Sequence, residues 1–208
     1  MNSTVDKTEV NHFDKPNQDW WDESGSFSAL HRLTPCRIEY ILQVIKRNKI
    51  NKQINSSTQI CNNLNILDVG CGGGLLCEPL SRLGGNVTGI DVSKNAILTA
   101  KQHASKMGLK INYICTSLEE LNLKKDFDLI IASEVIEHVL NRKYFLKMVR
   151  KISSNKTSFI FTTINKSIPS LLFGKFAAEY ILKLIPKGTH DWEKFVTPQK
   201  LYLEALEN

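Results

Sequence analysis

A glycine-rich turn between two short apolar runs is the feature of this sequence with the clearest chemical meaning. The first run, residues 66–69, ends at Gly70, and three more glycines follow within the next four positions. Asp91 stands 21 residues after Gly70, at the end of the second run, residues 86–91. Glycines let the backbone turn tightly against a ligand, and an acidic residue at this spacing suits the two hydroxyls of a ribose. The dinucleotide-binding loop has a glycine where this chain has Leu75, so the pattern favours a ribose without a pyrophosphate.

A second group of candidate residues follows the apolar run at residues 127–132. Glu134, Glu137 and His138 are spaced as i, i+3 and i+4, which puts their side chains on one face if the segment is a helical turn. Two carboxylates and an imidazole so placed could hold Mg²⁺ or Mn²⁺, or supply a general base. The alternative is that the same residues serve packing and ligand contacts.

Alternating strands and helices are needed to position these residues. Apolar periodicity and turn residues predict strands at 66–69, 87–90, 111–115, 127–132 and 158–163, and helices at 10–21, 35–45, 75–82, 94–107, 144–152 and 198–207. This alternation predicts a parallel sheet with helices on both faces. Ligands bind such sheets at the carboxyl ends of the strands, where Gly70, Asp91 and Ser133 all stand.

Composition and charge exclude few functions. The chain has 208 residues, 42% hydrophobic and 23% charged, and is expected to form a single domain of residues 1–208. Its net charge of +6 would suit nucleic acid or an anionic membrane, but no run of Arg and Lys alternates with aromatic residues, so nucleic acid is not expected as a partner. Five cysteines without a C-x-x-C pair disfavour a disulfide framework or a zinc site and indicate a reducing compartment.

Three segments carry a resemblance to a known family. Residues 66–74, ILDVGCGGG, resemble motif I of the class I S-adenosylmethionine-dependent methyltransferases at every position. Residues 20–37 resemble the W-W-D-x-x-G-x-F-x-x-L-H-x-x-N-P-x-R segment of the ubiquinone-biosynthesis O-methyltransferases, with Thr34 in place of the usual asparagine. Residues 186–195 are similar to the P-K-G-T-H-x-W-x-K-F segment of the same family, and the resemblance as a whole covers about residues 10–205.

The resemblance implies a Rossmann-like α/β fold with a helical cap (residues 10–46), a cofactor-binding core (64–165) and an amphipathic segment (166–197). Position by position, it implies that S-adenosylmethionine is contacted by Arg37, Gly70, Asp91 and Ser133. Arg37 would pair with the cofactor carboxylate, for which a guanidinium is suited by geometry. The matching magnesium ligands would be Glu134, Glu137 and His138.

The reaction implied is methylation of a phenolic hydroxyl on a polyprenylated catechol or hydroquinone, at two steps of ubiquinone synthesis. The hydroxyl, with a pKa of ~10, must lose its proton before it attacks the sulfonium methyl. Either a bound cation lowers that pKa, or His138 or His190 takes the proton. The family also implies a peripheral location on the cytoplasmic face of a bacterial inner membrane or the matrix side of the mitochondrial inner membrane, and allows membership in a ubiquinone-biosynthesis protein complex.

Residues 169–186 have their own pattern. Lys175, Glu179 and Lys183 recur at four-residue intervals in an otherwise apolar stretch, which predicts a helix with one narrow polar stripe. The stretch is too short and too charged to span a bilayer of ~20 residues. It suits either a helix lying in a membrane surface or a lid over the substrate pocket.

The C-terminal region departs from the expected fold. After the strand at residues 158–163 this fold normally adds two more strands, the last antiparallel, whereas here only the helix predicted at residues 198–207 remains. The strand at 158–163 is therefore expected to have an open edge.

The alternatives to the implied function are another small-molecule methyltransferase of class I and a catalytically idle binding subunit. A dehydrogenase would want the glycine that Leu75 replaces, and a nucleic-acid methyltransferase acting on exocyclic amines would usually have an [N/D]-P-P-[Y/F] motif at Ser133.

Overall fold

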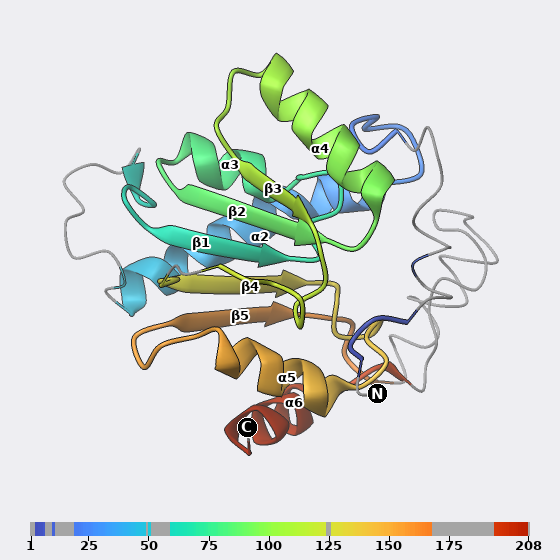
Figure 1. The fold of residues 1–208 in the computed structure, drawn as a ribbon, viewed down its shortest axis with the longest axis vertical. Helices are drawn as coiled ribbons and strands as arrows, with labels where there is room; N and C mark the ends of the chain where they lie inside the picture. Colours follow the sequence, from blue (N-terminus) through green and yellow to red (C-terminus); the bar gives the residue numbers. More distant parts are fainter. Residues whose placement is uncertain are drawn as a thin grey trace.

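Five parallel strands form one sheet in the order β3-β2-β1-β4-β5 (Figure 1). The computed structural model of the protein describes residues 3–6, 10, 19–48, 50, 59–123, 126–167 and 194–207. The strands are β1 (Asn65–Val69), β2 (Asn86–Asp91), β3 (Asn112–Cys115), β4 (Leu129–Ser133) and β5 (Ser158–Thr162). Because the chain builds β2 and β3 on one side of β1 and then crosses to β4, the strand order reverses between β1 and β4. The predicted parallel sheet is confirmed.

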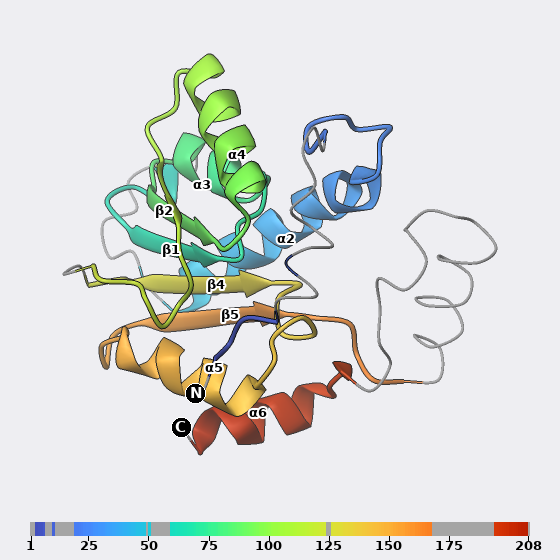
Figure 2. The ribbon, with the colours of Figure 1, turned by 45° about the vertical axis from the view of Figure 1, so that its right-hand side comes forward.

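Helices cover both faces of this sheet. One layer contains α2 (Ser28–Arg47), α3 (Cys77–Arg82) and α4 (Lys94–Lys106), and the other contains α5 (Arg142–Lys151) and α6 (Pro198–Leu206) (Figures 1 and 2). Neighbouring residues of a strand point to opposite faces, so Ile66 packs beneath the first layer and Leu67 beneath the second. Both faces are apolar, as expected of a parallel sheet covered on both sides.

The predicted elements agree with the structure except at the N-terminal helices. The helix expected at residues 35–45 begins at Ser28, and Pro35 lies inside it. Pro35 has no N–H to donate to the carbonyl of His31, four residues before it. The preceding residue adds a side-chain contact one position earlier, where Oγ1 of Thr34 donates to the carbonyl of Leu30 at 2.8 Å. The helix expected at residues 10–21 lies largely outside the described residues, and its last two positions, Trp20 and Trp21, form a turn instead.

The outer edge of β5, which was expected to be open, has no strand beside it in the described part of the chain. There β5 pairs with β4 alone, and the side chain of Phe159 in β5 is 40% exposed. No helix among the described residues is long and apolar enough to cross a membrane.

The last helix, α6, is held to α5 by a two-point ion pair. Nε and Nη2 of Arg142 donate to the two carboxylate oxygens of Glu204 at 2.5 and 2.9 Å. This fork geometry is the strong form of a charged hydrogen bond. By contrast, the pair between Lys143 and Glu207 is exposed on both sides, with side chains 67% and 63% accessible.

We therefore expect Glu204→Gln to lower the free energy of unfolding by about 1–3 kcal/mol, because it removes charge from a partly buried pair. Glu207→Gln, the matched control on the same helix, should change it by less than about 0.5 kcal/mol. Urea unfolding followed by circular dichroism measures both. Equal losses in the two variants would contradict the assigned role of the Arg142 pair.

Candidate functional site

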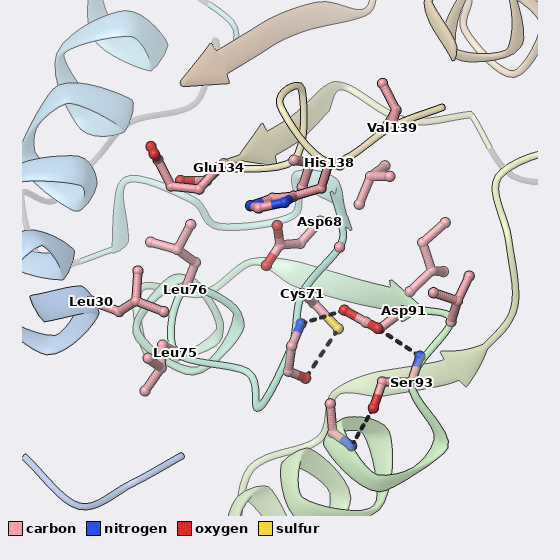
Figure 3. A pocket seen from close by; sticks show the side chains of 18 of the residues that line it. Leu30, Asp68, Cys71, Leu75, Leu76, Asp91, Ser93, Glu134, His138 and Val139 are labelled. Atoms are coloured by element: carbon pink, nitrogen blue, oxygen red, sulfur yellow. Dashed lines mark hydrogen bonds between the residues drawn. The ribbon is translucent and has the colours of Figure 1, made fainter. Parts of the chain in front are cut away.

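A cavity of about 410 Å³ opens at the carboxyl ends of β1, β2 and β4 (Figure 3). Its lining includes every candidate residue that falls in the described part of the chain, namely Arg37, Gly70, Asp91, Ser133, Glu134, Glu137 and His138. His190 lies outside the described residues. Residues from α2, from two strand ends and from the turn after β4 thus meet in one place, at the edge where ligands bind such sheets.

The glycine loop after β1 needs its glycines for both conformation and space. Gly70 and Gly72 have φ values of +72° and +51°, in the left-handed region that favours glycine. A Cβ added at Gly70 would lie 2.5 Å from Cγ2 of Val135, and one at Gly72 would lie 2.6 Å from the ring of Trp20. The loop is therefore packed between the turn after β4 and an aromatic side chain.

Asp91 is fixed at the mouth of this loop. Its Oδ2 accepts a hydrogen bond from the backbone N–H of Gly72 at 2.9 Å, and its Oδ1 accepts one from the N–H of Ser93 at 2.8 Å. Ser93 in turn caps α4 by accepting from the N–H of Ala96. Each carboxylate oxygen has a further lone pair, so Asp91 can hold the loop and still accept from ligand hydroxyls.

Asp68, the residue two positions before Gly70, acts at the far end of the glycine loop. It is 1% exposed, and its Oδ2 accepts from the thiol of Cys77, the first residue of α3, at 3.2 Å. Burial raises the pKa of Asp68 to about 7, and the nearby charge of Asp91 adds to the effect. The backbone of the loop itself is held by Asp91.

Two tryptophans contact the glycine loop, a role that the sequence did not indicate. Trp20 packs against Gly73, and Nε1 of Trp21 donates to the carbonyl of Gly73 at 3.1 Å. Trp21 also stacks on His103 of α4, with ring centroids 3.6 Å apart. Nε2 of His31 lies 2.8 Å from the carbonyl oxygen of Trp20.

The segment after β4 is a turn, so the predicted helical face of acidic residues is wrong. Glu134 has a φ of +56°, which is uncommon for a residue other than glycine. Its N–H donates to the carbonyl of Thr162 at 2.9 Å and so extends the pairing of β4 with β5. This pairing and the left-handed conformation stop a helix from starting here, and residues 136–138 form a tight turn instead.

The two acidic residues of this turn face different partners. Oε1 of Glu134 contacts Nη2 of Arg37 at 3.1 Å and accepts from Oγ1 of Thr162 at 2.9 Å. Arg37, which was expected to meet the cofactor carboxylate, therefore contacts a protein carboxylate through one of its five N–H donors. Ser133 reaches the same group, with its Oγ 2.8 Å from Oγ1 of Thr162.

Glu137 is the more deeply buried of the two, at 3% exposure. Its Oε2 accepts from Oγ1 of Thr163 at 2.8 Å, whereas its Oε1 is buried without a hydrogen-bond partner in the described part of the chain. Burial, with the neighbouring carboxylate of Glu134, raises the pKa of Glu137 to about 8. His138 is labelled in the same pocket in Figure 3.

These three side chains do not form a ready metal site. Among the described residues, no group of three or more His, Cys, Asp or Glu side chains is arranged to hold a metal ion. The contacts of Glu134 with Arg37 and Thr162 explain part of this, because they occupy one of its oxygens. The unpartnered oxygen of Glu137 is the feature that a cation could still use.

Several lining residues were missed from the sequence. Ser117 and Leu118 follow β3, and their place at a strand end could have indicated them. Thr4, Val5 and Asp6 also line the cavity, although nothing in the polar N-terminal sequence pointed to this.

Comparison with known proteins agrees with this geometry. The family model described as "Methyltransferase domain" matches residues 67–161. The crystal structure of the plantazolicin methyltransferase BpumL with a pentazolic desmethylPZN analogue and SAH aligns with a TM-score of 0.60 at 19% identity, over 95% of this chain and 74% of that one. A likeness at this identity shows the fold alone.

Closer relatives share most of the sequence length. Ubiquinone biosynthesis O-methyltransferase of Bradyrhizobium diazoefficiens is 42% identical over 206 residues, covering 99% of this chain and 81% of the relative. The protein of the same name from Pelagibacter ubique is 46% identical over 201 residues, covering 97% and 82%. This chain therefore belongs to the ubiquinone biosynthesis O-methyltransferase family.

Proposed function

We propose that this protein transfers a methyl group from S-adenosylmethionine to a phenolic hydroxyl of a polyprenylated catechol or hydroquinone on the route to ubiquinone. The observation that carries the proposal is the carboxylate of Asp91, fixed by Gly72 and Ser93 at the mouth of the glycine loop. Family membership supports the choice of substrate class. Another small-molecule acceptor is the second candidate, because the fold is shared with a methyltransferase named for a different substrate, the plantazolicin methyltransferase BpumL.

We orient the cofactor in this cavity by the chemistry of the lining residues. The ribose hydroxyls donate to Asp91, while the glycine loop lies against the middle of the ligand. Arg37 and Glu134 mark the opposite side of the pocket, where a guanidinium suits the carboxylate of the methionine part. Methyl transfer then takes place near the turn after β4.

The phenol must be deprotonated there. A neutral imidazole accepts a proton near physiological pH, and His138 lines the cavity beside the two acidic residues, so we assign it as the general base. His190 stays the alternative from the sequence, outside the described residues.

The cofactor assignment predicts that Asp91→Ala weakens S-adenosylmethionine binding by at least ~100-fold, since a charged acceptor for two hydroxyls is lost. Asp91→Asn, which keeps one oxygen and the size of the side chain, should bind with intermediate affinity. Titration calorimetry measures the affinity, and circular dichroism checks that the fold is intact. An unchanged affinity of Asp91→Ala for S-adenosylmethionine would contradict the assignment of Asp91 as the ribose-binding residue.

Magnesium stays a prediction from the family resemblance. The buried, unpartnered Oε1 of Glu137 favours it, because a cation would satisfy that oxygen beside the carboxylate of Glu134. When bound, the ion would lower the pKa of the phenol and orient its oxygens.

If a cation is required, chelation should suppress turnover at least ~10-fold without weakening S-adenosylmethionine binding, because the ion would act on the phenol alone. Glu137→Gln should show the same loss, whereas Glu120→Gln, at an exposed position, should not. Steady-state assays with and without chelator measure this. Full activity in excess chelator would remove magnesium from the mechanism.

We further propose that residues 169–186, which lie outside the described residues, attach the protein to the membrane surface that holds its polyprenylated substrate. The support is the sequence pattern, with Lys175 and Lys183 on the single polar stripe. This would place the protein peripherally on the cytoplasmic face of a bacterial inner membrane, or on the matrix side of the mitochondrial one, where a complex of the pathway could also form.

Reversing both charges, Lys175→Glu with Lys183→Glu, should abolish binding to anionic vesicles at low salt, at about 1 kcal/mol per charge removed. Lys101→Glu with Lys147→Glu changes the net charge equally at exposed sites on α4 and α5 and should leave binding unchanged or slightly weaker. Liposome flotation compares them. A wild-type chain that stays unbound would favour the pocket lid instead.

A further inference from the structure

Three residues near the N-terminus form part of the wall of the cofactor cavity. The cavity lining includes Thr4, Val5 and Asp6 together with Asp91 and Ser117, although these last two stand about 85 or more positions later in the sequence. Thr4 is 6% exposed, which is unusual for a polar residue so close to a terminus. The dark blue segment in Figure 1 lies beyond the carboxyl ends of β4 and β5.

The carboxylate of Glu119, in the loop after β3, anchors this segment. It accepts hydrogen bonds from the N–H of Thr4 at 2.8 Å, from Oγ1 of Thr4 at 2.5 Å and from Oγ of Ser3 at 3.2 Å. Both oxygens of Glu119 are used, so the segment is held at two points of one charged group. Glu119 stands two residues after Ser117, which lines the cavity itself.

Two further contacts extend the attachment to other elements. The carbonyl of Thr4 accepts from the N–H of Leu140, which follows the turn after β4. Asp6 forms an ion pair with Lys194, with Oδ2 and Nζ 3.4 Å apart. Residues 3–6 therefore bridge the loops after β3 and β4, and Val5 lies between the two anchored residues as an apolar part of the wall.

We propose that residues 3–6 are a strap across the cofactor pocket, and that Glu119 is the positioning residue whose hold on Thr4 sets how fast the cofactor product leaves. The proposal rests on the proposed function for the identity of the ligand. Residues 3–6 can detach without disturbing the sheet, because the contacts described for them are with loops and not with a strand. S-adenosylhomocysteine dissociates when the contacts of Thr4 with Glu119 break and the wall opens.

The test uses the full chain and S-adenosylhomocysteine. Glu119→Gln weakens the hold on Thr4, Thr4→Val removes its hydroxyl at constant shape, and Glu120→Gln is the matched control at the exposed neighbouring position. Stopped-flow dissociation, read from the fluorescence of Trp20 in the cavity wall, should be about tenfold faster in Glu119→Gln and faster in Thr4→Val. Thr4→Ser should restore the wild-type rate, and the double variant should be no faster than Glu119→Gln alone.

Each outcome decides the proposal. Dissociation from both Glu119→Gln and Thr4→Val at the rate of Glu120→Gln would overturn the strap while leaving the proposed function in place. Wild-type chain that fails to bind S-adenosylhomocysteine would overturn the proposed function and the strap together. A melting temperature measured for each variant separates a change in the strap from a loss of fold, and Thr4→Val decides the matter if Glu119→Gln does not fold.

Discussion

The pairing of β1 with β2 is the constraint on which the site depends. The ladder continues past the end of β1, where the N–H groups of Gly70 and Cys71 both donate to the carbonyl of Ile90, at 2.8 and 3.0 Å. This brings the glycine loop to the end of β2, where Asp91 takes the next donor of the loop, the N–H of Gly72. Backbone hydrogen bonds and one carboxylate thus fix the loop without any ligand contact.

Side-chain packing also holds the glycine loop in place. Gly89, in the middle of β2, has the sulfurs of Cys71 and Cys77 2.9 Å from where a Cβ would stand, so the first turn after β1 lies directly on the sheet. Trp20 packs against Gly72 and Gly73 of the loop, and Trp21 donates to the carbonyl of Gly73. A loop held this firmly can bind its ligand with little loss of conformational entropy.

In the proposed function, the turn after β4 serves both the cofactor and the substrate. Glu134 links Arg37 of α2 to Thr162 of β5, and Glu137 is tied to Thr163 one residue further on. A buried carboxylate (Glu137) beside a partly exposed one (Glu134) favours a shared proton or a cation. A change at Arg37 is therefore expected to reach Glu134 directly, and through Glu134 the side of the pocket proposed to hold the substrate.

Local sequence determined the sheet, α4 and the position of Asp91. Strands need only short apolar runs, the cap at Ser93 is a contact within three residues, and the spacing from Gly70 to Asp91 spans one strand–helix–strand unit. Arg37, Ser133 and His138 were assigned to the site from the family resemblance, and all three line one cavity, while their individual roles stay predictions. His190 stays a prediction, because it lies outside the described residues.

Tertiary structure alone decided the rest. Glu134 adopts its left-handed conformation because the chain 28 residues later supplies the carbonyl and hydroxyl of Thr162, which no helical pattern near Glu134 reveals. The strap is the extreme case, since Thr4 and Glu119 are 115 residues apart. Residues so distant along the chain are brought together by the folded sheet, and their side-chain types are ordinary polar ones whose partners no local periodicity specifies.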